Sequence, residues 1–204
     1  MRSSILLLVG LVTAGCDLKQ SAGGPKSDSP STEVAKSARK TIPSQDEIKA
    51  IVKALSQNDL DAVKAGFGND IDPDFTFADG KTVLSASASL GNLEATKFML
   101  DIGADPKKGD KRGMTPLHYA ALYGRGDSVI PLLIEAGVSV NVREATGMTP
   151  LHCAATGESE ATVKLLLASG ADKTLKTLFG ATPERTAELN DKPALACVIH
   201  AYTK

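Results

Sequence analysis

The sequence predicts an all-α fold, a solenoid of stacked helix-turn-helix units with projecting β-turns. The hexapeptide Gly-Met-Thr-Pro-Leu-His occurs twice, at Gly113–His118 and Gly147–His152. Looser copies begin at Gly80 and Gly180, so the four motif glycines lie 33, 34 and 33 residues apart. Each copy continues into small residues, an aliphatic run and a further glycine. Because one such unit cannot bury its own apolar face, the units are expected to stack.

The chain begins with a pattern typical of export. Met1-Arg2 is a short basic start, residues 5–12 form an apolar core, and residues 13–15 are small. The apolar run is too short for a stable membrane span. Small residues directly before Cys16 resemble the lipobox of bacterial lipoproteins, although Thr13 stands where an aliphatic residue is usual. The resemblance implies that Cys16 is lipidated and becomes the mature N-terminus. The alternative is an ordinary signal peptide cut nearby.

A polar segment separates Cys16 from the repeats. Residues 17–43 are rich in Ser, Gly, Pro, Ala and Lys, which predicts a flexible tether. About 28 residues of such coil span roughly 30 Å root-mean-square. Asp17 resembles the inner-membrane retention signal of enterobacterial lipoproteins, a rule that varies between bacteria. We therefore expect an exported protein that is lipid-anchored to a cell membrane and faces the periplasm.

Each repeat is expected to form two short helices. Thr115-Pro116 and Thr149-Pro150 suit the cap and first position of a helix. Paired alanines then keep the first helix thin, and the aliphatic run gives the second helix its buried face. Five glycines are expected to end these helices. They are Gly91 and Gly124 after first helices, and Gly103, Gly137 and Gly170 after second helices.

These motifs resemble the ankyrin-repeat family, in which Thr-Pro-Leu-His-x-Ala recurs about every 33 residues. The resemblance covers roughly residues 44–204 and is most specific in the two middle copies. The outer copies depart at Val83, Ser85 and Ser87, and at Glu184, Arg185 and Glu188. Polar residues in the last copy suit a terminal capping unit. The expected divisions are a signal peptide (1–15), a lipid-anchored linker (16–43), degenerate N-terminal capping helices (44–76), three repeats (77–109, 110–143 and 144–176) and a C-terminal capping repeat (177–204).

The histidines and cysteines raise the question of catalysis. His118, His152 and Cys153 are residue types that form nucleophiles or metal sites. The family resemblance implies instead that each His binds turn backbone and joins one repeat to the next. Adjacent residues on a helix also point in different directions. No catalytic, phosphate-binding or metal-binding motif is present, so we expect no enzyme activity, no cofactor and no metal site.

Two cysteines lie in the repeat region. Cys153 and Cys197 are expected in different helices of adjacent units as two buried thiols, with a disulfide as the alternative.

From Ser44 onward the chain has 17 Lys plus Arg and 21 Asp plus Glu. Nucleic-acid binding would favour a strongly basic face, so we expect no nucleic-acid partner.

The resemblance also indicates where a partner would bind. Ankyrin proteins usually contact partners through the projecting turns and the exposed side of the first helices. The corresponding residues here are Lys111, Arg112, Met114, Leu122, Tyr123, Met148, Leu178 and Phe179. They would form an apolar strip with two basic residues beside it. We expect a monomeric protein-protein interaction module that binds an unidentified envelope protein. The alternative is a periplasmic inhibitor or immunity protein that blocks an enzyme or toxin.

Overall fold

Helices arranged in consecutive pairs make up the structure, a computed structural model that describes residues 42–67, 71–125 and 127–203. The expected signal peptide, Cys16 and nearly all of the expected tether lie outside these residues. The first helices of the pairs are α2 (Gln45–Gln57), α4 (Val83–Leu90), α6 (Pro116–Tyr123), α8 (Pro150–Thr156) and α10 (Pro183–Leu189). The second helices are α3 (Leu60–Gly66), α5 (Leu93–Asp101), α7 (Val129–Glu135), α9 (Glu160–Ala168) and α11 (Pro193–Ala201).

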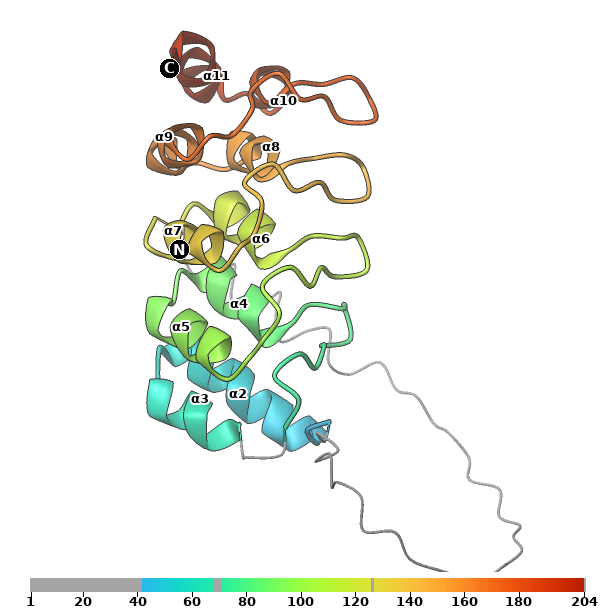
Figure 1. Ribbon diagram of the computed structural model, residues 1–204, viewed down its shortest axis with the longest axis vertical. Coiled ribbons are helices and arrows are strands. Elements are labelled where there is room, and N and C mark those ends of the chain that lie inside the picture. Colours follow the sequence, from blue (N-terminus) through green and yellow to red (C-terminus); the bar gives the residue numbers. More distant parts are fainter. Residues whose placement is uncertain (1–41, 68–70, 126, 204) are drawn as a thin grey trace, which may run out of the picture.

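The pairs stack in chain order into an elongated solenoid, as Figure 1 shows. The first helices form an inner row and the second helices an outer row. Hairpin-shaped turns extend from the inner row on the side away from the outer helices (Figure 1). An isolated β-bridge pairs Thr76 with Thr82, and no strand is present in the described ranges. The predicted all-α solenoid is therefore confirmed.

Local sequence explains where the inner helices begin and end. Thr82 caps α4 by accepting a hydrogen bond from the amide of Ser85 at 3.1 Å. Gly91 ends the same helix in the left-handed region, with φ of 68°. A Cβ atom at this position would also collide with the carbonyl oxygen of Arg125 in the next unit. Glycine thus serves both the cap and the close approach of neighbouring units.

Two rows of buried aliphatic side chains run along the stack. One row comes from the inner helices: Leu84, Leu117 and Leu151, each fully buried. The other comes from the outer helices: Met99, Leu133, Leu166 and Ile199, also fully buried. Burying one such side chain stabilises the fold by about 1.5–3 kcal/mol. Glu184 stands where a fourth inner Leu would lie, so the inner row ends at the last unit.

The repeated histidines join successive units. His118 is buried, and its Nε2 lies 3.2 Å from the carbonyl oxygen of Met148. Because a carbonyl only accepts, Nε2 donates, which leaves Nδ1 to accept from the amide of Thr115 at 3.1 Å. His152 repeats the arrangement, with Ala181 as its carbonyl partner at 3.1 Å. The structural role expected for both histidines is confirmed.

The two described cysteines lie in different environments and are not bonded to each other. Cys153 on α8 is buried, and burial raises the pKa of its thiol to about 12. Cys197 on α11 is exposed, so the expectation of two buried thiols is wrong for this residue. No further unit follows α11 within the described residues, so nothing packs over Cys197 there.

Candidate protein-binding surface

In the last three hairpin turns, a side chain three residues before the motif glycine braces the turn. Asp110 Oδ1 accepts from the amides of Arg112 at 2.8 Å and Met114 at 2.9 Å. Glu144 Oε1 accepts from the amides of Thr146 at 2.9 Å and Met148 at 3.1 Å. Two backbone donors are thereby fixed in each turn, which holds the turn in one shape.

Thr177 braces the last hairpin in the same way as Asp110 and Glu144 brace theirs. Its hydroxyl accepts from the amides of Phe179 and Ala181, both at 3.3 Å. The three hairpins thus share one internal design, with a carboxylate in two of them and a hydroxyl in the third.

The bracing carboxylates remain ionised although they are withdrawn from solvent. Burial would raise the pKa of Asp110, but hydrogen bonds from Tyr119, Met114 and Arg112 outweigh it and lower the pKa. The Tyr119 hydroxyl donates to Asp110 Oδ2 at 2.6 Å. For Glu144, burial is likewise outweighed by hydrogen bonds from Thr146 and Met148, and the pKa is lowered. The carboxylates of these hairpins therefore accept hydrogen bonds within the turns.

Neighbouring hairpins are linked through their backbones. The amide of Ala145 donates to the carbonyl of Arg112, and the amide of Leu178 donates to that of Thr146, both at 2.8 Å. The guanidinium of Arg143 donates to the carbonyls of Gly147 and Lys176. These bonds align the last three hairpins side by side along the stack.

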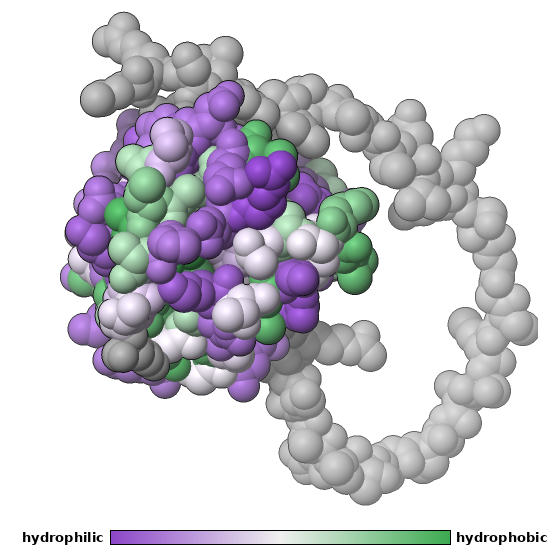
Figure 2. Space-filling model, turned by 90° about the horizontal axis from the view of Figure 1, so that it is seen from above, coloured by the Kyte–Doolittle hydropathy of each residue, from purple (hydrophilic) through white to green (hydrophobic). Residues whose placement is uncertain are grey.

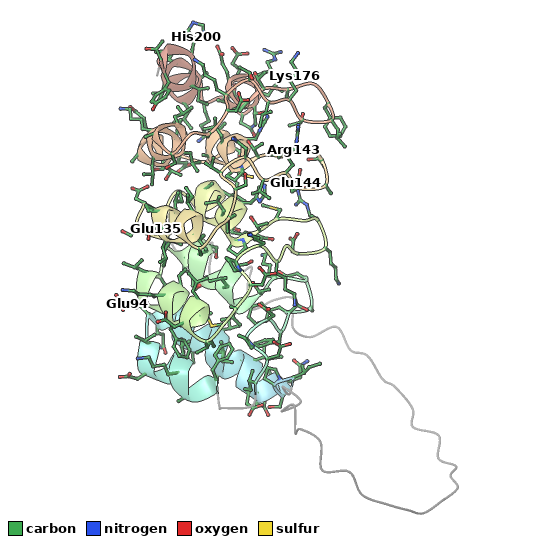
Figure 3. The ribbon with its side chains drawn as sticks, in the orientation of Figure 1. Glu94, Glu135, Arg143, Glu144, Lys176 and His200 are labelled. Atoms are coloured by element: carbon green, nitrogen blue, oxygen red, sulfur yellow. The ribbon has the colours of Figure 1, made fainter. Side chains whose placement is uncertain are left out.

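We call the exposed surface of residues 77–81, 110–114, 143–148 and 176–180 the hairpin face. All the charged side chains that are exposed on it are basic: Lys111, Arg112, Arg143 and Lys176. Asp79 and Lys81 are half-buried and paired at 3.2 Å. In Figure 3, Arg143 and Lys176 lie on the side where the hairpins project. The hairpin face is therefore positive although the described units as a whole are not.

The hairpin face also has an exposed apolar pair at its C-terminal end. Leu178 is 76% exposed and Phe179 is 85% exposed. Seen from that end in Figure 2, one hydrophobic group lies at the edge on the side where the hairpins project. Large side chains this exposed, with basic neighbours, are typical of surfaces that bind other proteins.

The predicted binding residues are only partly brought together. Lys111, Arg112, Leu178 and Phe179 lie exposed on the hairpin face, and Tyr123 is 48% exposed at the end of α6. Leu122 and Met148 are half-buried against the core. The role of these residues in binding stays a prediction.

Met114 requires a correction. It was expected on the surface, but it is only 5% exposed and belongs to the hydrophobic core. Its amide is held by Asp110, which places the residue at the base of the turn. A flexible thioether fills irregular gaps readily, so the side chain packs inward. The apolar strip is therefore interrupted at this position.

Three exposed residues were missed by the sequence reasoning. Arg143 and Lys176 lie four residues before their motif glycines, whereas the predicted residues Lys111 and Arg112 lie two residues and one residue before theirs. Leu189, at the end of α10, is 64% exposed. It lies nine residues after Gly180, as Leu122 lies nine after Gly113. The repeat register was the signal that could have identified Leu189.

The outer helices carry the opposite charge. From residue 93 to residue 168, exposed acids outnumber exposed bases on the outer helices and their N-terminal turns. The acids are Glu94, Asp101, Asp127, Glu135, Glu158 and Glu160, and the bases are Lys97, Arg125 and Lys164. Figure 3 shows Glu94 and Glu135 on the side opposite Arg143 and Lys176. The two long faces of the stack thus differ in sign.

Two other properties of the described residues bear on function. No group of three or more His, Cys, Asp or Glu side chains there could hold a metal ion. None of the helices in the same part of the chain has the length and apolar character needed to cross a membrane.

Comparison with known proteins agrees with the family resemblance of the sequence motifs. A family model described as ankyrin repeats (3 copies) matches residues 51–144 and 126–177. An ankyrin repeat-containing protein of Schizosaccharomyces pombe is 32% identical over 118 residues, which are 57% of this chain and 56% of that protein. Protein PhlB of Serratia liquefaciens is 38% identical over 118 residues, 57% of this chain and 52% of that protein.

Longer relatives match through a small part of their length. The human SH3 and multiple ankyrin repeat domains protein 2 is 27% identical over 157 residues, 77% of this chain but 8% of that protein. The chain thus spans about half of the first two relatives and a small fraction of the third.

Proposed function

Because this chain belongs to the ankyrin-repeat family, we propose that it is a non-catalytic module that binds an envelope protein and is tethered to a bacterial membrane. Ankyrin repeats indicate a protein-protein interaction module. The observation that supports a binding role most directly is the exposed pair Leu178 and Phe179 beside exposed basic residues on braced hairpins. Pre-formed turns bind with a smaller loss of conformational entropy than flexible loops.

The proposed tether rests on the sequence. Small residues directly precede Cys16, and a polar segment of Ser, Gly, Pro and Lys follows it. A lipid on Cys16 would place the repeats in the periplasm, within reach of other envelope proteins. A single lipid chain binds membranes only weakly, so stable attachment requires more than one acyl chain.

Site-specific crosslinking tests the binding role. A photo-crosslinking residue at position 123 or 179 should capture the same protein from intact cells. The control is the crosslinker at Glu94, which is exposed on the outer helix α5. If neither position captures a protein that the control position does not, the proposed binding face is wrong. If the captured protein is an enzyme or toxin that the chain inhibits, the module acts as an inhibitor.

Cell fractionation tests the tether. The variant Cys16→Ala should move from the membrane fraction to the soluble fraction. Cys197→Ala changes an exposed cysteine and should leave the distribution unaltered. A Cys16→Ala variant that stays with the membranes would show that no lipid on this residue holds the protein there.

A further inference from the structure

We infer that the partner segment bound by the hairpin face is an acidic, extended peptide with an aromatic or aliphatic anchor. This inference rests on the proposed function and deepens it by naming the chemistry of the partner. It depends on the charges of the hairpin face, on the opposite charge of the outer helices and on the position of the apolar pair.

The four exposed cations of the hairpin face are available to a ligand. Lys111 Nζ donates to the carbonyl of Ala78 at 2.9 Å, and Arg143 donates to backbone carbonyls. These acceptors are uncharged. Within the residues described, none of Lys111, Arg112, Arg143 and Lys176 forms an ion pair. The nearby acids Asp110 and Glu144 are turned inward to brace the hairpins. An acidic ligand would therefore supply the carboxylates that the hairpin face lacks.

The opposite face disfavours the same ligand. The exposed acids of the outer helices, including Glu94 and Glu135, repel carboxylates. A protein with oppositely charged faces orients an approaching charged partner, which raises the association rate and selects one face. The charge distribution thus directs an acidic segment to the hairpins.

The exposed apolar residues of the hairpin face favour a ligand that also has an aromatic or aliphatic anchor. Leu178 and Phe179 are exposed at the C-terminal end of the hairpin row, next to Lys176. Aromatic and aliphatic anchors commonly dominate the energy of a protein interface, and surrounding charges tune specificity. Four hairpins spaced about 8–10 Å apart cover roughly 30 Å. An extended peptide of about 9–10 residues spans that distance.

An anionic membrane surface is the main competing ligand. A planar surface would touch the hairpin tips but not Tyr123, which lies at the far end of the eight-residue helix α6. At about 1.5 Å per residue, that helix separates Tyr123 from the hairpin by roughly 11 Å. A peptide can contact both the tips and the inner helices, so the geometry favours it.

Binding of synthetic peptides to the full chain tests the inference. The probe is a fluorescent peptide of about 10 residues containing Asp, Glu, Leu and Phe, a length that matches the hairpin row. Two comparison peptides replace its acids with Lys or its Leu and Phe with Ser. We expect fluorescence anisotropy to show that the probe binds more tightly than both. Its affinity should also fall as ionic strength rises from about 0.05 to 0.5 M.

Charge reversal locates the site. The double variant Arg112→Glu and Lys176→Glu should weaken binding of the probe by at least about tenfold. The matched control, Lys97→Glu and Lys164→Glu, changes the net charge equally on the outer helices. It should leave the affinity within about twofold, since charges beyond a Debye length are screened.

Three results would overturn the inference. They are equal binding of the basic peptide, equal weakening by the control variant, and binding to vesicles rich in phosphatidylglycerol without binding to the acidic peptide. The proposed function is tested separately. If position 123 still captures its partner when Arg112 and Lys176 are reversed, the module binds protein but the acidic chemistry is wrong. If no partner is captured, the proposed function itself fails.

Discussion

His118 pairs backbone groups from two neighbouring units. Replacing it with Ala removes the acceptor for the Thr115 amide and the donor to the Met148 carbonyl, and it leaves a cavity. Unpaired buried groups cost about 1–3 kcal/mol each. We therefore expect His118→Ala to lower the free energy of unfolding by about 2–4 kcal/mol in urea titrations. The control, His200→Ala, alters an exposed residue and should change it by less than about 0.5 kcal/mol. Equal effects of the two variants would contradict the proposed link.

The same histidines predict how stability depends on pH. Burial lowers the pKa of His118 and of His152 below the ordinary value of 6.5. Below that value the unfolded chain binds protons that the folded chain does not, so acid favours unfolding. The free energy of unfolding should fall as pH decreases from about 7.5 to about 5.5. Constant or rising stability over this range would contradict the prediction.

A double variant tests whether the histidines, and not the carboxylates, cause this pH dependence of stability. Asp110 and Glu144 have lowered pKa values, and their ordinary values are 3.8 and 4.5. Both therefore remain largely ionised in either state above about pH 5.5. Replacing His118 and His152 with Gln should flatten the dependence of the unfolding free energy on pH between about 7.5 and 5.5.

At the scale of the elements, the loops between units differ in one bond. Asp74 accepts from the amide of Asp105 at 2.8 Å, and Asn141 accepts from the amide of Asp172 at 2.8 Å. Each acceptor lies six residues before a motif glycine. Lys107 occupies the equivalent position in the second repeat and has no acceptor to offer. This interface between units therefore lacks the bond that its neighbours have.

Lys107→Asn should supply the missing bond to the amide of Ser139. We expect the free energy of unfolding to rise by about 0.5–1.5 kcal/mol, the usual net value of one hydrogen bond. The converse variant, Asn141→Lys, should lower the free energy of unfolding. Thermal melting of the two variants beside the parent chain measures both effects. A decrease for Lys107→Asn would show that the lysine itself stabilises the interface.

The repeat pattern explains how far the sequence predicted these elements. Thr-Pro pairs and helix-ending glycines are local signals, so the starts of α6 and α8 and the ends of α4 and α6, at Gly91 and Gly124, were predictable. Exposure depends on neighbouring units instead. Met114 was expected outside and packs inside, while Cys197 was expected inside and lies exposed on the last described helix, α11. Neither outcome follows from spacing alone, because both depend on what packs over the residue.

At the scale of the whole molecule, the two long faces of the stack differ in the charge that they expose. The acids of the hairpins are used internally, which leaves basic residues exposed there. The acids of the outer helices remain on the surface. A chain whose units from Ser44 onward have four more acids than bases can thus present a positive hairpin face. Net charge alone did not reveal this division, because it sums over both faces.

The end of the stack should decide whether the molecule stays monomeric. Glu184 lies where the inner helices of earlier units place Leu84, Leu117 and Leu151, and Glu188 replaces the second Ala of the motif. Polar residues at the last unit keep another unit from stacking on it. Glu184→Leu with Glu188→Ala should therefore make the chain self-associate, and sedimentation velocity should detect a concentration-dependent increase in mass.

A matched variant tests whether self-association depends on where the residues are replaced or only on the added hydrophobicity. Glu94→Leu with Glu160→Ala makes the same replacements at exposed sites on the outer helices α5 and α9. It should remain monomeric, because isolated apolar residues on a polar face do not form a continuous patch. If both variants associate equally, added hydrophobicity alone is responsible. If neither associates at any concentration, the polar residues of α10 do not limit the stack.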